Sequence, residues 1–282
     1  MRLATVRTGG GTAAVRVEGD RGIVVPDVAD VGELLAHPDW RSRAERAAGP
    51  AVPLGEPAAV IPRPGKVVCV GLNYRAHILE MGRPLPDYPT LFAKFTDTLI
   101  GPHDDIEIPS EAADAVDWEC ELVVVVGATV RGADEIEAAA AIAGYTAMND
   151  VSMRDWQFRT REWLQGKNFG NTTPLGPVLV TVDEWQPGPA IRTLVDGEVV
   201  QQASTGDLVF DPAQLVSYIS RMITLRPGDV IATGTPGGVG HARTPPRYLV
   251  PGSIVRVEID GIGALENTCV AVDARGRRAV PA

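Results

Sequence analysis

Residues 117–126 read DWECELVVVV, and this stretch decides the fold of the chain. Its second half is too β-branched and too apolar for a surface helix, so it predicts a buried strand. Alternate residues of a strand share one face, which places Glu119 and Glu121 side by side and turns Cys120 the other way. Two carboxylates about 5 Å apart repel by roughly 3 kcal/mol at an effective dielectric constant of about 20. The pair is therefore expected to need surrounding water, a bridging arginine or a bound cation.

A third carboxylate, Asp150, follows a helix-like stretch and a second apolar run. Three acidic side chains offer oxygen ligands, which hard cations such as Mg²⁺, Mn²⁺ or Ca²⁺ prefer and zinc does not. Glu119, Glu121 and Asp150 are therefore predicted to form one divalent-cation site.

The composition argues against several classes of function. With 282 residues the chain can bury a full core, and its net charge of −10 disfavours nucleic acid or an anionic membrane as the main partner. No window approaches the roughly 18 uninterrupted apolar residues of a membrane span, and the first residues lack the apolar core of a signal peptide. The three cysteines lie in or beside apolar runs, as reduced thiols do. These features predict a soluble, cytoplasmic protein.

Short strand patterns dominate the chain and do not alternate strictly with helical ones, which favours a β-rich α+β fold over a doubly wound sheet. A Pro- and Gly-rich connector, residues 49–65, predicts a small N-terminal domain with its linker over 1–62 and a larger domain over 63–282. Helices are expected over 31–48, 75–81, 134–143 and 212–222. Strands are expected over 12–17, 22–25, 67–70, 121–126, 178–182, 191–195, 229–233 and 254–259.

Several further residues could take part in chemistry. His77 and Glu80 share one face if their segment is helical, so they form either a histidine base oriented by a carboxylate or an exposed surface pair. Arg154 shortly follows Asp150 and could clamp a substrate carboxylate or pair with a local acid. Lys167, in a Gly-containing loop, could neutralise an anion or a developing enolate, or could simply be solvated. The glycine-rich segment 232–240 is a weak signal for any ligand.

The order of these motifs resembles that of the fumarylacetoacetate hydrolase superfamily, in its acylpyruvate hydrolase-like branch. The resemblance covers roughly residues 63–272, and the first 60 residues resemble the small, variable N-terminal domain of many members. The matching segments are 71–80, 91–94, 119–121, 149–157, 166–167, 174–177, 227–231 and 233–236.

The resemblance implies a β-rich mixed roll that forms homodimers, with Mg²⁺ or Mn²⁺ held by Glu119, Glu121 and Asp150. Ca²⁺ could be bound in its place. It also implies a catalytic dyad of His77 and Glu80. The implied substrate contacts are Lys94, Arg154, Gln157, Lys167 and Thr235, of which Lys167 is also expected to stabilise the enolate.

Two positions depart from the family pattern. Ala76 stands where many members have an acid before the histidine, and Gly170 stands where an acid often follows the lysine segment. Neither is a metal ligand or a member of the dyad, so the chemistry is better specified than the substrate.

The implied activity is hydrolytic cleavage of a carbon–carbon bond in a 1,3-diketo acid such as an acylpyruvate or fumarylpyruvate. The alternatives with the same metal site are decarboxylation of oxaloacetate and isomerisation of 2-hydroxyhepta-2,4-diene-1,7-dioate. A member that binds metal without catalysis, or one recruited to specialised metabolism, is a further alternative, because fold analogy does not choose among reactions.

Overall fold

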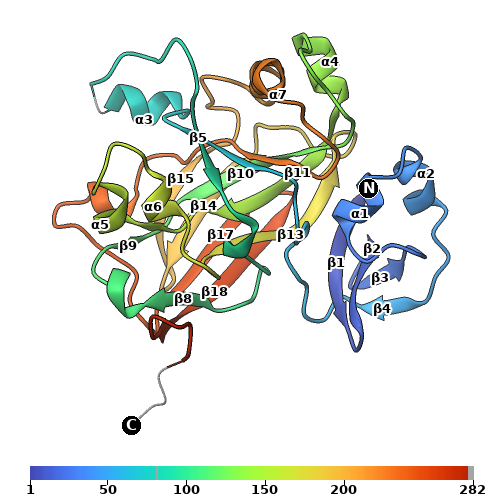
Figure 1. Ribbon diagram of the computed structural model, residues 1–282, viewed down its shortest axis with the longest axis horizontal. Coiled ribbons are helices and arrows are strands. Elements are labelled where there is room, and N and C mark those ends of the chain that lie inside the picture. The colour runs from blue at the N-terminus through green and yellow to red at the C-terminus, as the bar shows by residue number, and fades with distance from the viewer. Residues whose placement is uncertain (81, 279–282) are drawn as a thin grey trace.

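The computed structural model describes residues 1–80 and 82–278. Its N-terminal part forms four strands and two short helices, at the right of Figure 1. These elements are β1 (Arg2–Thr8), β2 (Gly11–Glu18), β3 (Arg21–Val24), α1 (Val31–Leu35), α2 (Trp40–Glu45) and β4 (Ala51–Pro53). The single helix predicted over 31–48 is wrong. Pro38, which cannot continue a helix, lies in the break between α1 and α2.

Within the described residues, the largest sheet has 11 strands and begins in the N-terminal part. Its order is β4-β3-β2-β1-β13-β11-β10-β16-β5-β6, with β7 also paired to β13. The further strands are β5 (Val67–Gly71), β6 (Thr90–Lys94), β7 (Leu99–Ile100), β10 (Cys120–Val126), β11 (Ile142–Asn149), β13 (Thr173–Thr181) and β16 (Val230–Ala232). The sheet thus crosses the predicted boundary at residue 62 through the antiparallel pair β1 and β13. The division into two domains stays a prediction.

A second sheet of five strands packs near the first, in the order β15-β14-β17-β18-β8. These strands are β8 (Ile106–Pro109), β14 (Ala190–Val195), β15 (Glu198–Ser204), β17 (Ile254–Ile259) and β18 (Gly263–Val272). A small pair joins β9 (Val116–Asp117) to β12 (Ser152–Met153).

The remaining helices are short apart from α7 and lie around the sheets (Figure 1). They are α3 (Arg75–Glu80), α4 (Glu135–Ala140), α5 (Arg154–Gln157), α6 (Leu164–Lys167), α7 (Pro212–Met222), and the 3₁₀ turns η1 (Thr96–Thr98), η2 (Ser110–Ala112) and η3 (Gly240–Ala242). The predicted helix 212–222 is confirmed, with Asp211 in a capping box. The predicted helix 134–143 ends at Ala140 instead, because Ile142 begins the buried strand β11. None of the described helices has both the length and the apolar character of a membrane span.

Strand β10 is buried on both faces, as the sequence predicted. Leu122, Val124 and Val126 lie in the cluster that includes Ile191 and Leu215. Val123 and Val125 lie in a second cluster that includes residues of β1 and α1. The α+β, strand-rich architecture is therefore built around this strand, which starts immediately after Glu119.

Candidate active site

The three predicted metal ligands converge because β10 and β11 are antiparallel neighbours. Cys120 pairs with Asn149, so Asp150 lies opposite Glu119 and its N–H donates to the Glu119 carbonyl at 2.9 Å. Glu119, Glu121 and Asp150 are all buried, and one carboxylate oxygen of each lies within 4.8 Å of the others. The three carboxylates, hereafter the carboxylate trio, thus meet the proximity that a shared cation requires.

Two members of the trio are held by buried cations. Lys94 Nζ lies 2.7 Å from Asp150 Oδ1, and Lys167 Nζ lies 2.8 Å from Asp150 Oδ2. Lys167 also reaches Glu119 Oε2 at 2.9 Å, and Arg154 reaches Glu119 Oε1 at 2.7 Å. Burial raises the pKa of Asp150, but Lys167 and Lys94 outweigh it and hold that pKa below its ordinary value. Burial likewise lowers the pKa of Lys167, and Asp150 and Glu119 raise it above its ordinary value.

Glu121 is placed differently. Its Oε2 accepts the Gly234 N–H at 2.8 Å, but it forms no ion pair within the described part of the chain. Burial, and then the charges of Asp150 and Glu119, raise the pKa of this carboxyl well above its ordinary value. A buried carboxylate without a cation is costly, so Glu121 needs a proton or a bound cation.

The donor set fits a divalent cation of the Mg²⁺ or Mn²⁺ type. It consists of carboxylate oxygens alone, the ligands that such cations prefer. The unpaired charge of Glu121 is what a cation at this place would compensate. Glu119, Glu121 and Asp150 would hold it.

A cavity of about 320 Å³ opens beside the carboxylate trio. Six of the residues predicted for the site line it: His77, Glu119, Arg154, Gln157, Lys167 and Thr235. Glu121, Asp150 and Lys94 are not among the residues that line it, and the buried ammonium of Lys94 instead holds Asp150. Lys94 is thus placed to position a metal ligand, and its predicted contact with substrate stays a prediction.

Arg154 is the centre of a buried polar network under the cavity. Its Nε donates to Asp117 Oδ2 at 2.8 Å, and one terminal nitrogen donates to Gln157 Oε1 at 2.8 Å. Burial lowers the pKa of Arg154, but Glu119 and Asp117 raise it further, so the guanidinium remains charged. The alternative of a salt bridge to local acids therefore describes this arginine, which also keeps a face on the cavity.

His77 lies on α3 and is half-buried at the cavity wall. The helix is held at its start, where the Arg75 and Ala76 N–H groups donate to the carbonyl and side chain of Asp207. The Glu80 side chain lies outside the described part of the structure. The dyad of His77 and Glu80 therefore stays a prediction.

Other cavity residues were not identified from the sequence. Arg83, Phe158, Trp163 and His241 come from loops and helix ends that are far apart in the chain. The glycine-rich segment 232–240, noted as a weak ligand signal, ends just before His241, and no local pattern connects His241 with Phe158. Long-range packing brings them together.

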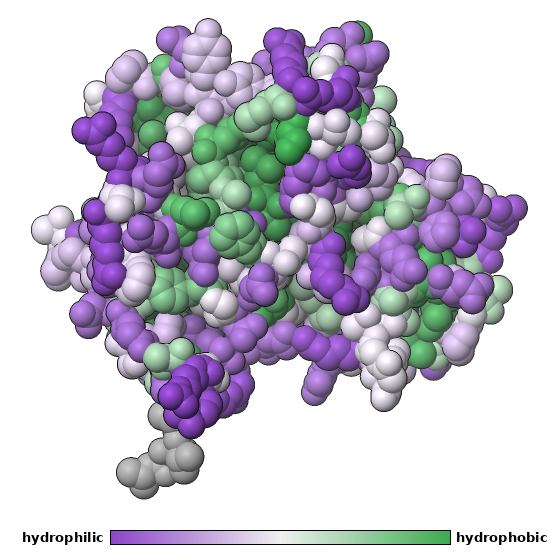
Figure 2. Space-filling view, in the orientation of Figure 1, coloured by the Kyte–Doolittle hydropathy of each residue, from purple (hydrophilic) through white to green (hydrophobic). Residues whose placement is uncertain are grey.

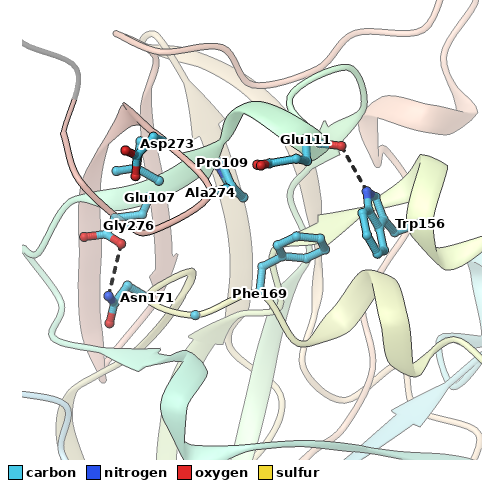
Figure 3. A pocket seen from close by; sticks show the side chains of 11 residues that line it. Glu107, Pro109, Glu111, Trp156, Phe169, Asn171, Asp273, Ala274 and Gly276 are labelled. Atoms are coloured by element: carbon cyan, nitrogen blue, oxygen red, sulfur yellow. Dashed lines mark hydrogen bonds between the residues drawn. The ribbon is translucent and has the colours of Figure 1, made fainter.

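A second cavity, of about 410 Å³, is lined by Trp156 of α5 (Figure 3). Trp156 donates its Nε1 hydrogen to the Glu111 carbonyl and packs against the edge of Phe169 at 5.2 Å between ring centroids. Asn171 donates to Glu107 on the far side of this cavity. Helix α5 thus contributes to both cavities. Arg154 and Gln157 line the first cavity, and Trp156 lines the second.

Comparisons with known proteins identify relatives of this chain in sequence and in structure. Residues 66–270 match the family model "Fumarylacetoacetate (FAA) hydrolase C-terminal". The chain is 44% identical over 216 residues to the mitochondrial oxaloacetate tautomerase of Xenopus laevis, covering 75% of this chain and 67% of that protein. It superimposes on the fumarylacetoacetate hydrolase of Exiguobacterium antarcticum with a TM-score of 0.86 at 32% identity, covering 96% of this chain and 100% of that one. For 5-carboxymethyl-2-hydroxymuconate delta-isomerase of Mycobacterium smegmatis the TM-score is 0.81 at 34% identity, with coverages of 96% and 100%.

Proposed function

The chain belongs to the fumarylacetoacetate hydrolase family, and we propose that it is a metal-dependent enzyme acting on small 2-oxo acids through their enol forms. The favoured reaction is the keto–enol tautomerisation of oxaloacetate. The observation that carries this proposal is the buried carboxylate trio, whose member Glu119 lines the cavity together with Lys167. This constellation can stabilise an enolate, which every candidate reaction shares.

A divalent cation at the trio would act as a Lewis acid toward the carboxylate and 2-oxo oxygens of such a substrate. Lys167 is held by Asp150 and Glu119 with a raised pKa, so it stays an ammonium at neutral pH. It supplies a fixed positive charge near the place where negative charge develops on the oxygen. Arg154 keeps Glu119 and Gln157 in place around the same space.

Tautomerisation needs a group that moves one proton from carbon 3 to the 2-oxo oxygen. The C3–H bond breaks, an O–H bond forms, and no water enters the product. His77 lines the cavity, and an imidazole can take up and release a proton near neutral pH. We assign this proton transfer to His77.

The names of the relatives support enol chemistry. A vertebrate protein 44% identical to this chain is named an oxaloacetate tautomerase, and a solved structure 34% identical is titled an isomerase. Both names describe reactions that shift a proton without breaking a carbon–carbon bond. They favour tautomerisation over the hydrolysis expected from the sequence.

Hydrolysis of an acylpyruvate or fumarylpyruvate is the second candidate. It is favoured by His77 at the cavity wall, where, oriented by Glu80, it would take a proton from an attacking water. The solved structure with a TM-score of 0.86 is titled a fumarylacetoacetate hydrolase. Decarboxylation of oxaloacetate would use the same enolate, without an attacking water.

The deciding experiment measures each reaction on the same purified protein with Mg²⁺ or Mn²⁺. Enol oxaloacetate is followed by its ultraviolet absorbance, decarboxylation by pyruvate release, and cleavage by loss of acetylpyruvate or fumarylpyruvate. We expect the enol signal of oxaloacetate to decay fastest relative to the uncatalysed rate. Glu121→Gln should abolish the activity, whereas Glu107→Gln, in the second cavity, should not. Faster cleavage of acylpyruvates than tautomerisation would replace the first candidate by the second.

Two further expectations accompany this proposal. The enzyme is proposed to work as a cytoplasmic homodimer, without nucleic acid or membrane as partner, in line with its net charge of −10. Figure 2 shows apolar residues gathered in the middle of one face, bordered by hydrophilic ones, as surfaces covered by a partner often are. Sedimentation at several protein concentrations tests the dimer.

A further inference from the structure

The catalytic cavity has a buried floor and an open mouth with different chemistry. At the floor, Glu119, Arg154 and Lys167 are all buried and bonded to one another or to nearby groups. At the mouth, Arg83, Phe158 and His241 are exposed. A 2-oxo acid bound through its carboxylate and carbonyl at the floor would extend its other end toward the mouth.

The loop of residues 240–249, hereafter the clasped loop, places His241 at the mouth of the cavity. The Asp117 carboxylate lies beneath its start and accepts the Gly240 N–H at 2.6 Å and the His241 N–H at 2.9 Å. Asp117 also accepts the Arg154 Nε hydrogen, so one buried carboxylate fixes both the floor and the mouth. The far end of the loop is tied by the Leu249 N–H to the Val116 carbonyl at 2.8 Å.

Close packing leaves the loop little freedom. A Cβ on Gly240 would lie 1.9 Å from the Arg247 carbonyl oxygen, a backbone atom that cannot give way, and 2.8 Å from Asp117 Oδ1. The Arg247 N–H in turn donates to the Gly240 carbonyl at 3.1 Å. The position of His241 is therefore set by the backbone around it.

The imidazole ring is also held by its neighbours. Tyr248 Oη lies 2.9 Å from His241 Nδ1, and the ring of Phe158 packs against the imidazole at 5.1 Å between centroids. When the Tyr248 hydroxyl donates to Nδ1, the proton of a neutral ring is on Nε2, and in the imidazolium both nitrogens carry protons. Nε2 makes no hydrogen bond within the described residues, so it can donate to a ligand.

The charges at the mouth select for an anion. Glu119 is the one carboxylate among the described residues lining the cavity, and Arg154 and Lys167 neutralise it. Arg83, also at the mouth, has no ion-pair partner among the residues that the structure describes. Among the described residues that line the cavity, a distal carboxylate would thus meet a guanidinium and an imidazole N–H and no free acid.

We propose that His241 is a specificity-determining residue that selects 2-oxo acids carrying a second carboxylate at their distal end. The inference rests on the proposed function and narrows its substrate class. It favours oxaloacetate or fumarylpyruvate over acetylpyruvate, which ends in a methyl group. Arg83, which lines the same cavity and is exposed, adds a positive charge for such a carboxylate.

The test compares two stable ligands that differ at the distal end, 2-oxoglutarate and 2-oxopentanoate. Each is titrated calorimetrically into the protein with Mn²⁺ present. Wild type should bind 2-oxoglutarate about tenfold more tightly, the scale of one hydrogen bond to a charged group. His241→Ala should remove most of this preference while leaving the affinity for 2-oxopentanoate unchanged.

Three further variants complete the design. His241→Gln keeps a donor and should keep part of the preference, and Tyr248→Phe, which frees the ring, should weaken it. His103→Ala, a substitution of an exposed histidine outside this cavity, should leave both affinities unchanged. Each variant is compared with wild type in thermal melting, and His241 is exposed, so its removal leaves the core intact.

The outcomes separate the two proposals. If neither ligand binds wild type, the proposed function fails and the inference falls with it. If both bind equally well, or if His241→Ala keeps the full preference, the role of His241 alone is overturned and the enol chemistry stands.

Discussion

Replacing Glu121 by Gln should stabilise the metal-free protein and strongly weaken its response to divalent cations. Glu121 is 1% exposed, accepts one backbone N–H, and has carboxylate oxygens of Glu119 and Asp150 within 4.8 Å. Each such repulsion is on the order of 3 kcal/mol at an effective dielectric constant of about 20. The cations bound to the other two carboxylates offset part of it. We therefore expect a net gain of about 1–3 kcal/mol in the free energy of unfolding, or roughly 2–6 °C in melting temperature.

The gain should depend on pH in a definite direction. Burial raises the pKa of Glu121 in the folded state, so its contribution to stability is complete below the ordinary value of about 4.3. This contribution is lost as the pH rises through the folded-state pKa. Glutamine has no such loss, and the advantage of Glu121→Gln should therefore grow from pH 4 toward neutrality.

Thermal melting in chelator and in Mn²⁺ measures both effects. Wild type should gain about 2.7 kcal/mol at a free Mn²⁺ concentration of about 100 times the dissociation constant, and Glu121→Gln should gain far less. Glu107→Gln serves as the control for loss of a glutamate elsewhere. If the variant melts below wild type in chelator at neutral pH, Glu121 is not strained. If the variant responds to Mn²⁺ as wild type does, Glu121 is not a metal ligand.

Three other substitutions test separate parts of the argument. His77→Ala should lower turnover by about 10²–10⁴-fold without weakening Mn²⁺ binding, and unchanged turnover on oxaloacetate and acylpyruvates alike would place the proton transfer elsewhere. Gly240→Ala should lower the melting temperature by several degrees and weaken 2-oxoglutarate binding, because its Cβ meets the Arg247 carbonyl at 1.9 Å; normal melting would contradict the clasped loop. Asp211→Ala should cost about 1 kcal/mol by removing the N-cap of α7, and chemical denaturation should show recovery in Asp211→Asn.

The carboxylate trio could be predicted because its determinants are local. The apolar run after Glu121 marks a buried strand, and strand alternation then fixes which face each acid shares. The position of Asp150 required one further step, the antiparallel pairing of that strand with the next apolar run. The buried strand follows from the hydrophobic pattern, whereas its pairing with the next apolar run is seen in the structure and was not predicted.

The mouth of the cavity could not be predicted in this way. Asp117 reads as one more acid in a sequence with 36 acidic residues, yet it binds N–H groups more than 120 positions away. No short-range pattern encodes such a contact. The break between α1 and α2 is different, because Pro38 is a local signal for the end of a helix. The helical pattern on both sides of Pro38 led to the prediction of one continuous helix.

The continuity of the large sheet has a practical consequence for shortening the chain. The family match covers residues 66–270, but a protein cut to that length would leave β13 as an exposed edge, with unpaired backbone groups where Arg2 and Leu3 now bind. It would also uncover apolar side chains of β10 and β13 that share a cluster with α1. Bare apolar edges recruit other strands. The excised segment should therefore aggregate on expression, although every residue that lines the catalytic cavity would still be present.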